Sequence, residues 1–265
     1  MIMPVRNAGP YVGDAIRSML GQEWTNWELL AVENDCSDNT GEVIAQFTDP
    51  RIRHLRTPLA GLCHARNMGL ANARGEFICF LDADDRLPPA SIISRIKKFR
   101  EQPDLRFVDG TVITFDKEFR DIRRRWSPDF RGLPYHEMGR MNPRCFSAIT
   151  WMIRRSDDVH MEFDTSWTHL EDRVFFLSVA HTGRYDYVNE HIYHIRRRSG
   201  SLMTNYREME QAFLRYLLLV KERNVLSESD WLAQKRYFHR MHALIFARQL
   251  RAWASARHAW CYFFS

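Results

Sequence analysis

Apolar runs alternate with stretches of helical spacing through the first 115 residues of the chain. Short apolar or alternating runs predict strands, and apolar positions three or four residues apart predict helices. The predicted strands are Met1–Val5, Trp27–Val32, Arg51–Arg56, Glu76–Leu81 and Phe107–Phe115. The predicted helices are Tyr11–Leu20, Asp38 or Thr40 to Phe47, Leu62–Ala73, and one that starts near Pro88–Ser91. This alternation predicts an α/β fold with a mostly parallel sheet and helices on both faces.

The pattern changes after residue 115. From Asp116 to Pro143 the chain is charged and aromatic with Pro and Gly, which predicts a long loop. The elements expected beyond it are a strand over Phe146–Arg154, a helix over Trp167–His181, a strand pair or extended run over Tyr185–Ile195, and helix from Thr204 almost to the end. The predicted organisation is one domain over residues 1–203, with halves 1–115 and 116–203, and a helical extension over 204–265.

Composition narrows the class of protein. The chain is 45% hydrophobic, enough for a core, and no run of about 18 uncharged apolar residues predicts a membrane-spanning helix. Five scattered cysteines show neither metal-ligand spacing nor a disulfide framework, which fits a reducing cytosol. No secretory signal is expected, because Met1 leads straight into folded-looking sequence. Only three residues precede Pro4, so the first strand is either short or begins upstream.

The most distinctive stretch is an apolar run that ends abruptly in acids. Phe77–Leu81 is followed by Asp82-Ala83-Asp84-Asp85, which places three carboxylates within four residues. A buried parallel strand here would present them at its carboxyl end, where open α/β sheets bind ligands. Carboxylates at this spacing suit Mg²⁺ or Mn²⁺, which tend to bridge to phosphates. The simpler alternative is a turn whose aspartates cap the next helix.

Several other segments stand in a fixed order around this cluster. They are Pro4–Ala8, Trp27–Asn34, Ser37–Thr40, Ala65–Leu70, Gly75–Ile78 and Phe80–Asp85. Together they resemble the family 2 glycosyltransferases, which have the Rossmann-like GT-A fold, and the resemblance covers about residues 1–200. It implies an inverting transferase that uses a nucleotide sugar and Mn²⁺ or Mg²⁺. The halves 1–115 and 116–203 would then bind the donor and face the acceptor.

The resemblance gives the acid cluster a role in donor binding. Asp84 would ligate the metal, and Asp82 would contact the ribose or support the metal shell, with Ala83 between them in the donor site. The chemistry agrees independently of the family, because the leaving nucleoside diphosphate carries charge that a metal neutralises without proton transfer.

A base pocket is implied at the ends of the first two strands. Pro4, Val5 and Arg6 would line it, with Arg6 where an aromatic residue is common. Glu33 and Asn34 stand where the family usually has two aspartates, one of which accepts the N3–H of uracil, and both retain an acceptor oxygen. A UDP-sugar is favoured, and guanosine and thymidine donors stay open. The alternative for these two residues is a simple turn.

Three basic positions would face the donor phosphates. Arg66 lies where family members carry an arginine near the donor, with a solvated helix arginine as the alternative. Arg196 and Arg198 belong to a basic loop that closes over the diphosphate in the family, and Arg198 replaces a common histidine. An arginine clamps phosphate but ligates no metal. His194 is a weaker candidate for a third metal ligand, and a solvated loop is the alternative.

A second carboxylate site lies at Glu171-Asp172. It resembles the family's Glu-Asp element, in which the aspartate is the general base. In a single displacement the acceptor hydroxyl loses its proton as it attacks the anomeric carbon, and a carboxylate on that face suits the task. Asp172 is therefore the predicted base. The alternative is an acid at a helix N-terminus that interacts with the helix dipole.

The C-terminal tail differs in charge from the rest. Residues 231–265 contain six Lys/Arg, no Asp or Glu, and interleaved aromatics. Such a helix suits peripheral contact with an anionic membrane, or it packs on the main domain. The expected location is the cytoplasm, at the inner membrane if the tail binds lipid. No recognition motif supports a nucleic-acid partner.

The expected function is transfer of a hexose or N-acetylhexosamine from a nucleotide sugar to a glycan or lipid-linked glycan, as in bacterial surface polysaccharide synthesis. The alternative from a different class is a catalytically silent glycan-binding or assembly subunit. The acid pair and Glu171-Asp172 favour the enzyme.

Overall fold

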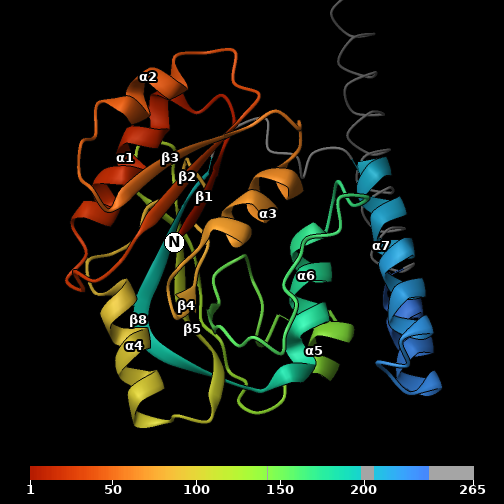
Figure 1. Cartoon of the computed structure of the whole chain (residues 1–265). Coiled ribbons are helices and arrows are strands. Elements are labelled where there is room, and N and C mark those ends of the chain that lie inside the picture. The colour runs from red at the N-terminus through yellow and green to blue at the C-terminus, as the bar shows by residue number, and fades with distance from the viewer. Residues whose placement is uncertain (142, 198–205, 239–265) are drawn as a thin grey trace, which may run out of the picture. The chain divides into compact units, whose positions relative to one another are not determined.

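The computed structural model describes residues 1–141, 143–197 and 206–238 (Figure 1). The chain divides into two compact units, residues 1–205 and 206–265. The expected boundary after residue 203 stays a prediction.

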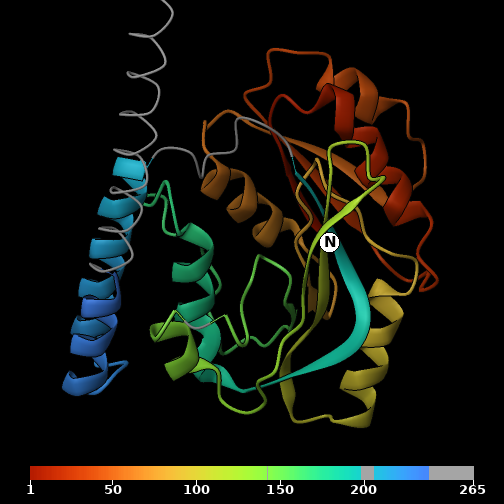
Figure 2. The ribbon, with the colours of Figure 1, turned by 180° about the vertical axis from the view of Figure 1, so that it is seen from behind.

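The first unit begins with three parallel strands. They are β1 (Ile2–Val5), β2 (Leu29–Asn34) and β3 (Ile52–Thr57), in the order β1-β2-β3. The helices that follow them are α1 (Gly9–Leu20), α2 (Thr40–Ala45) and α3 (Leu62–Asn72). Both ribbon views show α1 and α2 on one side of these strands and α3 on the other (Figures 1 and 2). This arrangement gives the sheet the two covered faces that the strand–helix alternation predicts.

A second, mixed sheet follows. Its strands are β4 (Phe77–Ile78), β5 (Leu105–Phe115), β6 (Ile122–Trp126), β7 (Met152–Arg154) and β8 (Arg184–Arg196). Antiparallel pairs join β4 to β7, β7 to β5 and β5 to β6, whereas β8 runs parallel to β5. Its helices are α4 (Ser91–Glu101), α5 (Tyr135–Gly139) and α6 (Glu171–Val179), and a 3₁₀ turn spans Ala180–Thr182.

The segment 77–81 connects the two sheets. Residues 77–78 form β4, and immediately afterwards the chain runs parallel to β1, where Ile2 N donates to Cys79 O at 2.8 Å and Leu81 N donates to Ile2 O at 3.0 Å. The predicted strand Glu76–Leu81 therefore exists as one extended segment that changes partner. The acids after Leu81 emerge at the carboxyl edge of β1, as expected for a ligand-binding edge.

Close packing fixes the position of α3 against β1. A Cβ on Gly69 would lie 2.3 Å from Ile2 Cγ2, so only glycine allows this approach. Phe163 stacks on Phe175 of α6 with ring centroids 4.1 Å apart, and Phe80 meets both rings edge-on. These fully buried aromatic contacts anchor α6 behind the acid segment.

The second half of the first unit differs from expectation in three places. The segment 116–143 contains β6 and α5 in addition to loops. Of the predicted strand Phe146–Arg154, only residues 152–154 pair. The helix expected from Trp167 begins at Glu171. The extended run expected over Tyr185–Ile195 is confirmed as one long strand, β8.

The second unit is helical where it is described. It contains α7 (Tyr206–Glu222) and a helical stretch over 228–238, separated by a turn in which Asn224 has a φ of 51°. Trp231 Nε1 donates to Leu217 O at 2.8 Å and joins the two helices. In the described part of the chain, no helix has the length and apolar character needed to cross a membrane. Most of the tail expected to meet a membrane, residues 239–265, lies outside the described residues.

Candidate active site

The predicted base-pocket residues lie together at one strand end. Pairing between β1 and β2 sets Pro4 beside Val32 and Val5 beside Glu33. Pro4 and Val5 are buried, whereas Arg6 is exposed and its Nη2 lies 3.1 Å from an Asp35 carboxylate oxygen. The strand pairing thus places all three at the carboxyl edge. Their contact with a base stays a prediction.

The side chains of Glu33 and Asn34 are engaged within the protein. Glu33 Oε2 lies 2.8 Å from His54 Nε2 and accepts a hydrogen bond from Arg56 Nε at 2.9 Å. Asn34 is buried, and its amide group both donates to and accepts from the backbone of the 59–61 segment. These contacts order the connection between β3 and α3. A base contact by either side chain stays a prediction, and it would have to add to or replace these interactions.

The acid cluster divides into accessible and buried residues. Asp82 and Asp84 keep partly exposed side chains, whereas Ala83 and Asp85 are buried. Asp85 N donates to Asp82 O at 3.0 Å, which closes the segment into a turn. The two predicted metal ligands are therefore accessible to a bound nucleotide.

Strand β8 holds the acid cluster in place. Tyr193 Oη accepts a hydrogen bond from Asp82 N at 2.8 Å, and an Asp85 carboxylate oxygen accepts one from Arg196 N at 2.7 Å. Desolvation raises the pKa of Asp85 well above its ordinary value, and the neighbouring carboxylates of Asp82 and Asp84 add to the rise.

Two aspartates are a small donor set for a divalent cation. Within the described ranges, no three His, Cys, Asp or Glu side chains group as metal ligands. Mg²⁺ sites usually consist of one or two carboxylates completed by waters and substrate phosphates. Desolvation raises the pKa of Asp82, Arg66 opposes the shift, and Asp84 adds to it, so a cation would relieve repulsion between the two carboxylates. The residues fit Mn²⁺ or Mg²⁺ that arrives with a diphosphate.

Arg66 connects the two carboxylate motifs. It lies on α3 and is only 3% exposed, so the alternative of a solvated helix arginine is wrong. Its Nη1 donates to Glu171 Oε1 at 2.9 Å, and its Nη2 lies 3.5 Å from Asp82 Oδ1. The guanidinium also packs over the Phe163 ring at 5.1 Å. A buried cation thus stands between the acid cluster and the Glu-Asp pair, which holds these groups at one site.

Glu171 and Asp172 open α6. The residue before them, Leu170, has a φ of 59°, a left-handed conformation that turns the chain into the helix. Burial raises the pKa of Glu171 and Asp172 adds to the rise, while Arg66 opposes it. Asp172 is partly exposed and accepts a hydrogen bond from Arg173 N at 2.7 Å. Glu171 therefore faces the protein and Asp172 remains reachable from solvent. Its role as base stays a prediction.

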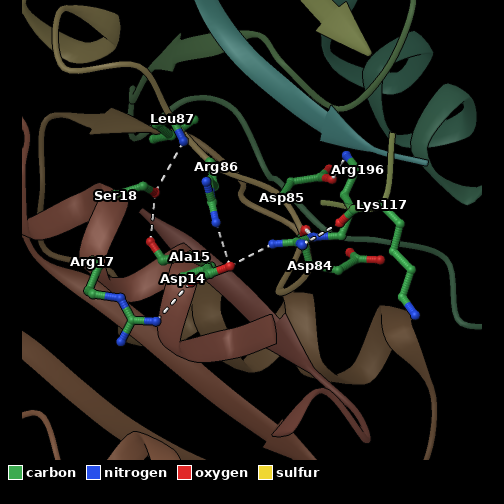
Figure 3. Close-up of polar contacts among 10 residues, drawn as sticks. All are labelled: Asp14, Ala15, Arg17, Ser18, Asp84, Asp85, Arg86, Leu87, Lys117 and Arg196. Atoms are coloured by element: carbon green, nitrogen blue, oxygen red, sulfur yellow. Dashed lines mark hydrogen bonds and ion pairs between the residues drawn. The ribbon is translucent and has the colours of Figure 1, made fainter. Parts of the chain in front are cut away.

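Arg196 contacts protein groups with its whole guanidinium (Figure 3). Nε donates to Asp84 O at 2.8 Å, Nη1 to Lys117 O at 2.6 Å, and Nη2 to Asp14 Oδ2 at 2.8 Å. The residue is 8% exposed. It positions the backbone of the acid cluster, and its expected contact with the diphosphate stays a prediction. Arg198 lies outside the described residues.

Asp14 of α1 is the centre of this network, and sequence reasoning missed it. Its carboxylate contacts three arginines: Arg86 at 2.6 Å, Arg196 at 2.8 Å and Arg17 at 2.8 Å (Figure 3). Burial opposes ionisation, but the hydrogen bonds from these arginines hold the pKa of Asp14 well below its ordinary value. The sequence shows only that Arg17 follows Asp14 by three residues. That spacing is typical of an exposed ion pair on a helix. Tyr193 was missed in the same way, since a buried strand tyrosine has no distinguishing neighbours in sequence.

Comparison with known proteins identifies the family of the chain. The profile described as Glycosyl transferase family 2 matches residues 1–160. The chain belongs to glycosyl transferase family 2. Family membership confirms the resemblance drawn from the ordered motifs.

Relatives in the family are similar over different shares of the chain. One is UDP-Glc:alpha-D-GlcNAc-diphosphoundecaprenol beta-1,3-glucosyltransferase WfgD of Escherichia coli, 45% identical over 86 residues, which are 32% of this chain and 34% of WfgD. Glycosyltransferase GlyG of Streptococcus pneumoniae is 25% identical over 229 residues, which are 77% of this chain and 72% of GlyG. The chain thus matches only about a third of WfgD.

Solved structures confirm the GT-A fold expected of the family. Staphylococcus aureus TarS 1-349 in complex with UDP-GlcNAc has a TM-score of 0.60 at 16% identity, covering 82% of this chain and 65% of that one. Mannosyltransferase PcManGT from Pyrobaculum calidifontis, in complex with GDP-Man and Mn²⁺, has a TM-score of 0.64 at 16% identity, covering 90% and 68%. The fold therefore accommodates donors with different bases.

Proposed function

We propose that this chain is an inverting, metal-dependent glycosyltransferase. It moves a hexose or N-acetylhexosamine from a UDP-sugar to a hydroxyl of a glycan or lipid-linked glycan, in bacterial surface polysaccharide synthesis on the cytoplasmic side of the membrane. The observation that carries the proposal is the Arg66 bridge, which holds the Asp82 carboxylate and the Glu171-Asp172 pair at one edge of the sheet. A donor motif and a base in that proximity are what a single displacement needs.

The proposed roles follow from burial and contacts. Asp84 and Asp82 would hold Mn²⁺ or Mg²⁺, which neutralises charge on the leaving diphosphate when bound. Asp172 accepts the proton of the acceptor hydroxyl as the acceptor oxygen bonds to the anomeric carbon and the bond to the diphosphate oxygen breaks. The buried Arg66 offsets the negative charge of both Glu171 and Asp82, because its guanidinium lies near both carboxylates.

The donor and acceptor are proposed from two sources. UDP is chosen because Glu33 and Asn34 retain acceptor oxygens and because WfgD is named for UDP-Glc. A lipid-linked glycan is chosen as acceptor because the name of WfgD specifies a diphosphoundecaprenol-linked sugar.

Thermal shift with nucleotides tests the donor site. UDP, GDP and dTDP are each added with Mn²⁺ or with EDTA to the wild type, Asp84→Ala and the control Asp157→Ala, which removes an exposed aspartate away from the site. We expect a Mn²⁺-dependent shift with UDP in the wild type and control, and none in Asp84→Ala. No shift with any nucleotide in folded wild-type protein would reject the proposal and favour the silent subunit.

Asp172→Asn separates chemistry from binding. It should retain the UDP–Mn²⁺ shift while transfer falls by about 100- to 10,000-fold, the usual contribution of a general base. NMR of the product should show the anomeric configuration opposite to that of the donor. Retention of configuration, or a variant that transfers like the wild type, would exclude the assigned mechanism.

A further inference from the structure

The hairpin formed by β5 and β6 carries more positive than negative charge. Residues 116–126 hold five Lys/Arg and three Asp/Glu. Asp116 and Asp121 both lie near Arg123, at 3.9 and 3.5 Å. The exposed Arg124 and Arg125 have no acidic partner among the residues that the structure describes. An anionic partner that meets this strand along its edge would reach two such guanidinium groups, one from each face of the strand.

An apolar side chain lies within the same exposed strand. Ile122 is 61% exposed, and it precedes Arg123, Arg124 and Arg125 on β6. Neighbouring strand residues point to opposite faces, yet residues 122–125 are all exposed, so the strand projects with both faces in solvent. An exposed isoleucine thus lies close to exposed arginines on one short strand, which matches a surface with anionic headgroups above an apolar layer.

The hairpin is attached to the acid cluster. Arg196 Nη1 donates to Lys117 O in the hairpin, and its Nε donates to Asp84 O. The Phe119 ring lies against the guanidinium groups of both Arg86 and Arg196, at 4.2 and 4.3 Å. The yellow-green hairpin lies on the near side of the sheet in Figure 2. A membrane that binds the hairpin would therefore lie close to the acid cluster.

We propose that the β5–β6 hairpin docks on the anionic phospholipid headgroups of a membrane. Arg124 and Arg125 would contact the phosphates, and Ile122 would insert between the headgroups. A nucleic acid would contact the arginines alone, because bases stack on aromatic side chains and isoleucine provides no such surface. The exposed isoleucine is thus the observation that favours lipid. The proposal concerns lipid binding alone and does not depend on the reaction that the site performs.

Vesicle sedimentation of the full chain tests the proposal. The vesicles are phosphatidylcholine, with or without phosphatidylglycerol. The variants are Arg124→Gln/Arg125→Gln and Ile122→Ser, and the matched control is Arg74→Gln/Lys97→Gln, which removes two exposed charges elsewhere. We expect the wild type and control to bind only the anionic vesicles. The arginine pair variant should bind them roughly 30-fold more weakly, from the usual contribution of each cation near an anionic surface.

Three results would overturn the proposal. The first is a wild type that does not sediment with anionic vesicles. The second is a hairpin variant that binds like the matched control, which would assign any lipid binding to another part of the chain. The third is duplex DNA that displaces the wild type from anionic vesicles, which would indicate a nucleic-acid surface formed by the arginines. Unchanged circular dichroism and an unchanged melting temperature show that the variants are folded.

Discussion

Removal of the Asp14 carboxylate should destabilise the acid cluster from a distance. Asp14→Ala leaves Arg196, whose side chain is 6% exposed, without its acidic partner. Removing one partner of a buried ion pair typically costs about 3–5 kcal/mol. Asp14 is itself 24% exposed, and Arg196 keeps two carbonyl acceptors, so we expect the lower end, about 3 kcal/mol. For a chain of this size that predicts a melting temperature lower by roughly 6–12 °C.

Thermal unfolding followed by circular dichroism measures this change, and Arg17→Ala is the control. Arg17 contacts the other Asp14 oxygen but is 64% exposed, so its loss should cost below about 1 kcal/mol. Because Arg196 also holds Asp84 O, Asp14→Ala should weaken Mn²⁺-dependent UDP binding, whereas Arg17→Ala should not. Equal melting temperatures for the two variants would refute the inference that Asp14 neutralises Arg196.

The Asp14 contribution also has a predicted pH dependence. The three arginines lower the pKa of Asp14 in the folded protein, so the native state binds a proton less tightly than the unfolded chain. The contribution is therefore complete above the ordinary aspartate pKa of about 4 and is lost as the pH falls below it. Asp14→Asn should flatten this acid limb in urea unfolding. An unchanged acid limb would contradict the assignment.

Buried charge and close packing elsewhere set three further expectations. Burial raises the pKa of Asp109 to about 7, so stability should fall by up to about 4 kcal/mol as pH rises from about 4 to 7, and Asp109→Asn should remove this slope in urea unfolding. Gly69→Ala should cost about 1–3 kcal/mol by the same assay, because the new Cβ meets Ile2. Arg66→Ala should cost about 3–5 kcal/mol in guanidinium unfolding and abolish the UDP–Mn²⁺ shift, with partial recovery in Arg66→Lys, because Glu171 loses its counter-charge. A stable Arg66→Ala that binds UDP would disprove the bridge.

Local patterns predicted the first half of the fold well. Strands, helices and their order up to residue 115 follow from apolar spacing, with ends shifted by a few residues, because each element there buries apolar residues at regular strand or helix spacing. The run Phe146–Arg154 shows the limit of that reasoning. It is apolar because Phe146, Ile149 and Trp151 are buried, but burial does not require strand pairing, and only its last three residues pair. The arginine-rich β6 was missed for the opposite reason, since an edge strand exposed on both faces has no apolar alternation.

The sequence located the candidate site but not the directions of its side chains. The motifs predict that the acid cluster, Arg66 and the Glu-Asp pair belong to one site. In the fold, Arg66 lies beside both Asp82 and Glu171. Whether Asn34 faces a ligand or the 59–61 segment depends on a connection whose conformation no local pattern encodes. The same holds for Arg196, whose partners Asp14, Asp84 and Lys117 come from three separate segments.

The change of partner within residues 77–81 affects how this chain could be recombined with its relatives. The first two residues of the segment are paired with β7, and the next three are hydrogen-bonded to β1. A chimera that keeps residues 1–75 and takes the rest from a relative would pair the original β1 with a foreign 77–81 segment. The backbone pairing of Ile2 could persist, but its side chain would have to pack against foreign side chains. Exchange of the acceptor-facing half should succeed more often when the junction lies after Asp85, because β1, residues 77–81 and the acid cluster then all come from the same protein.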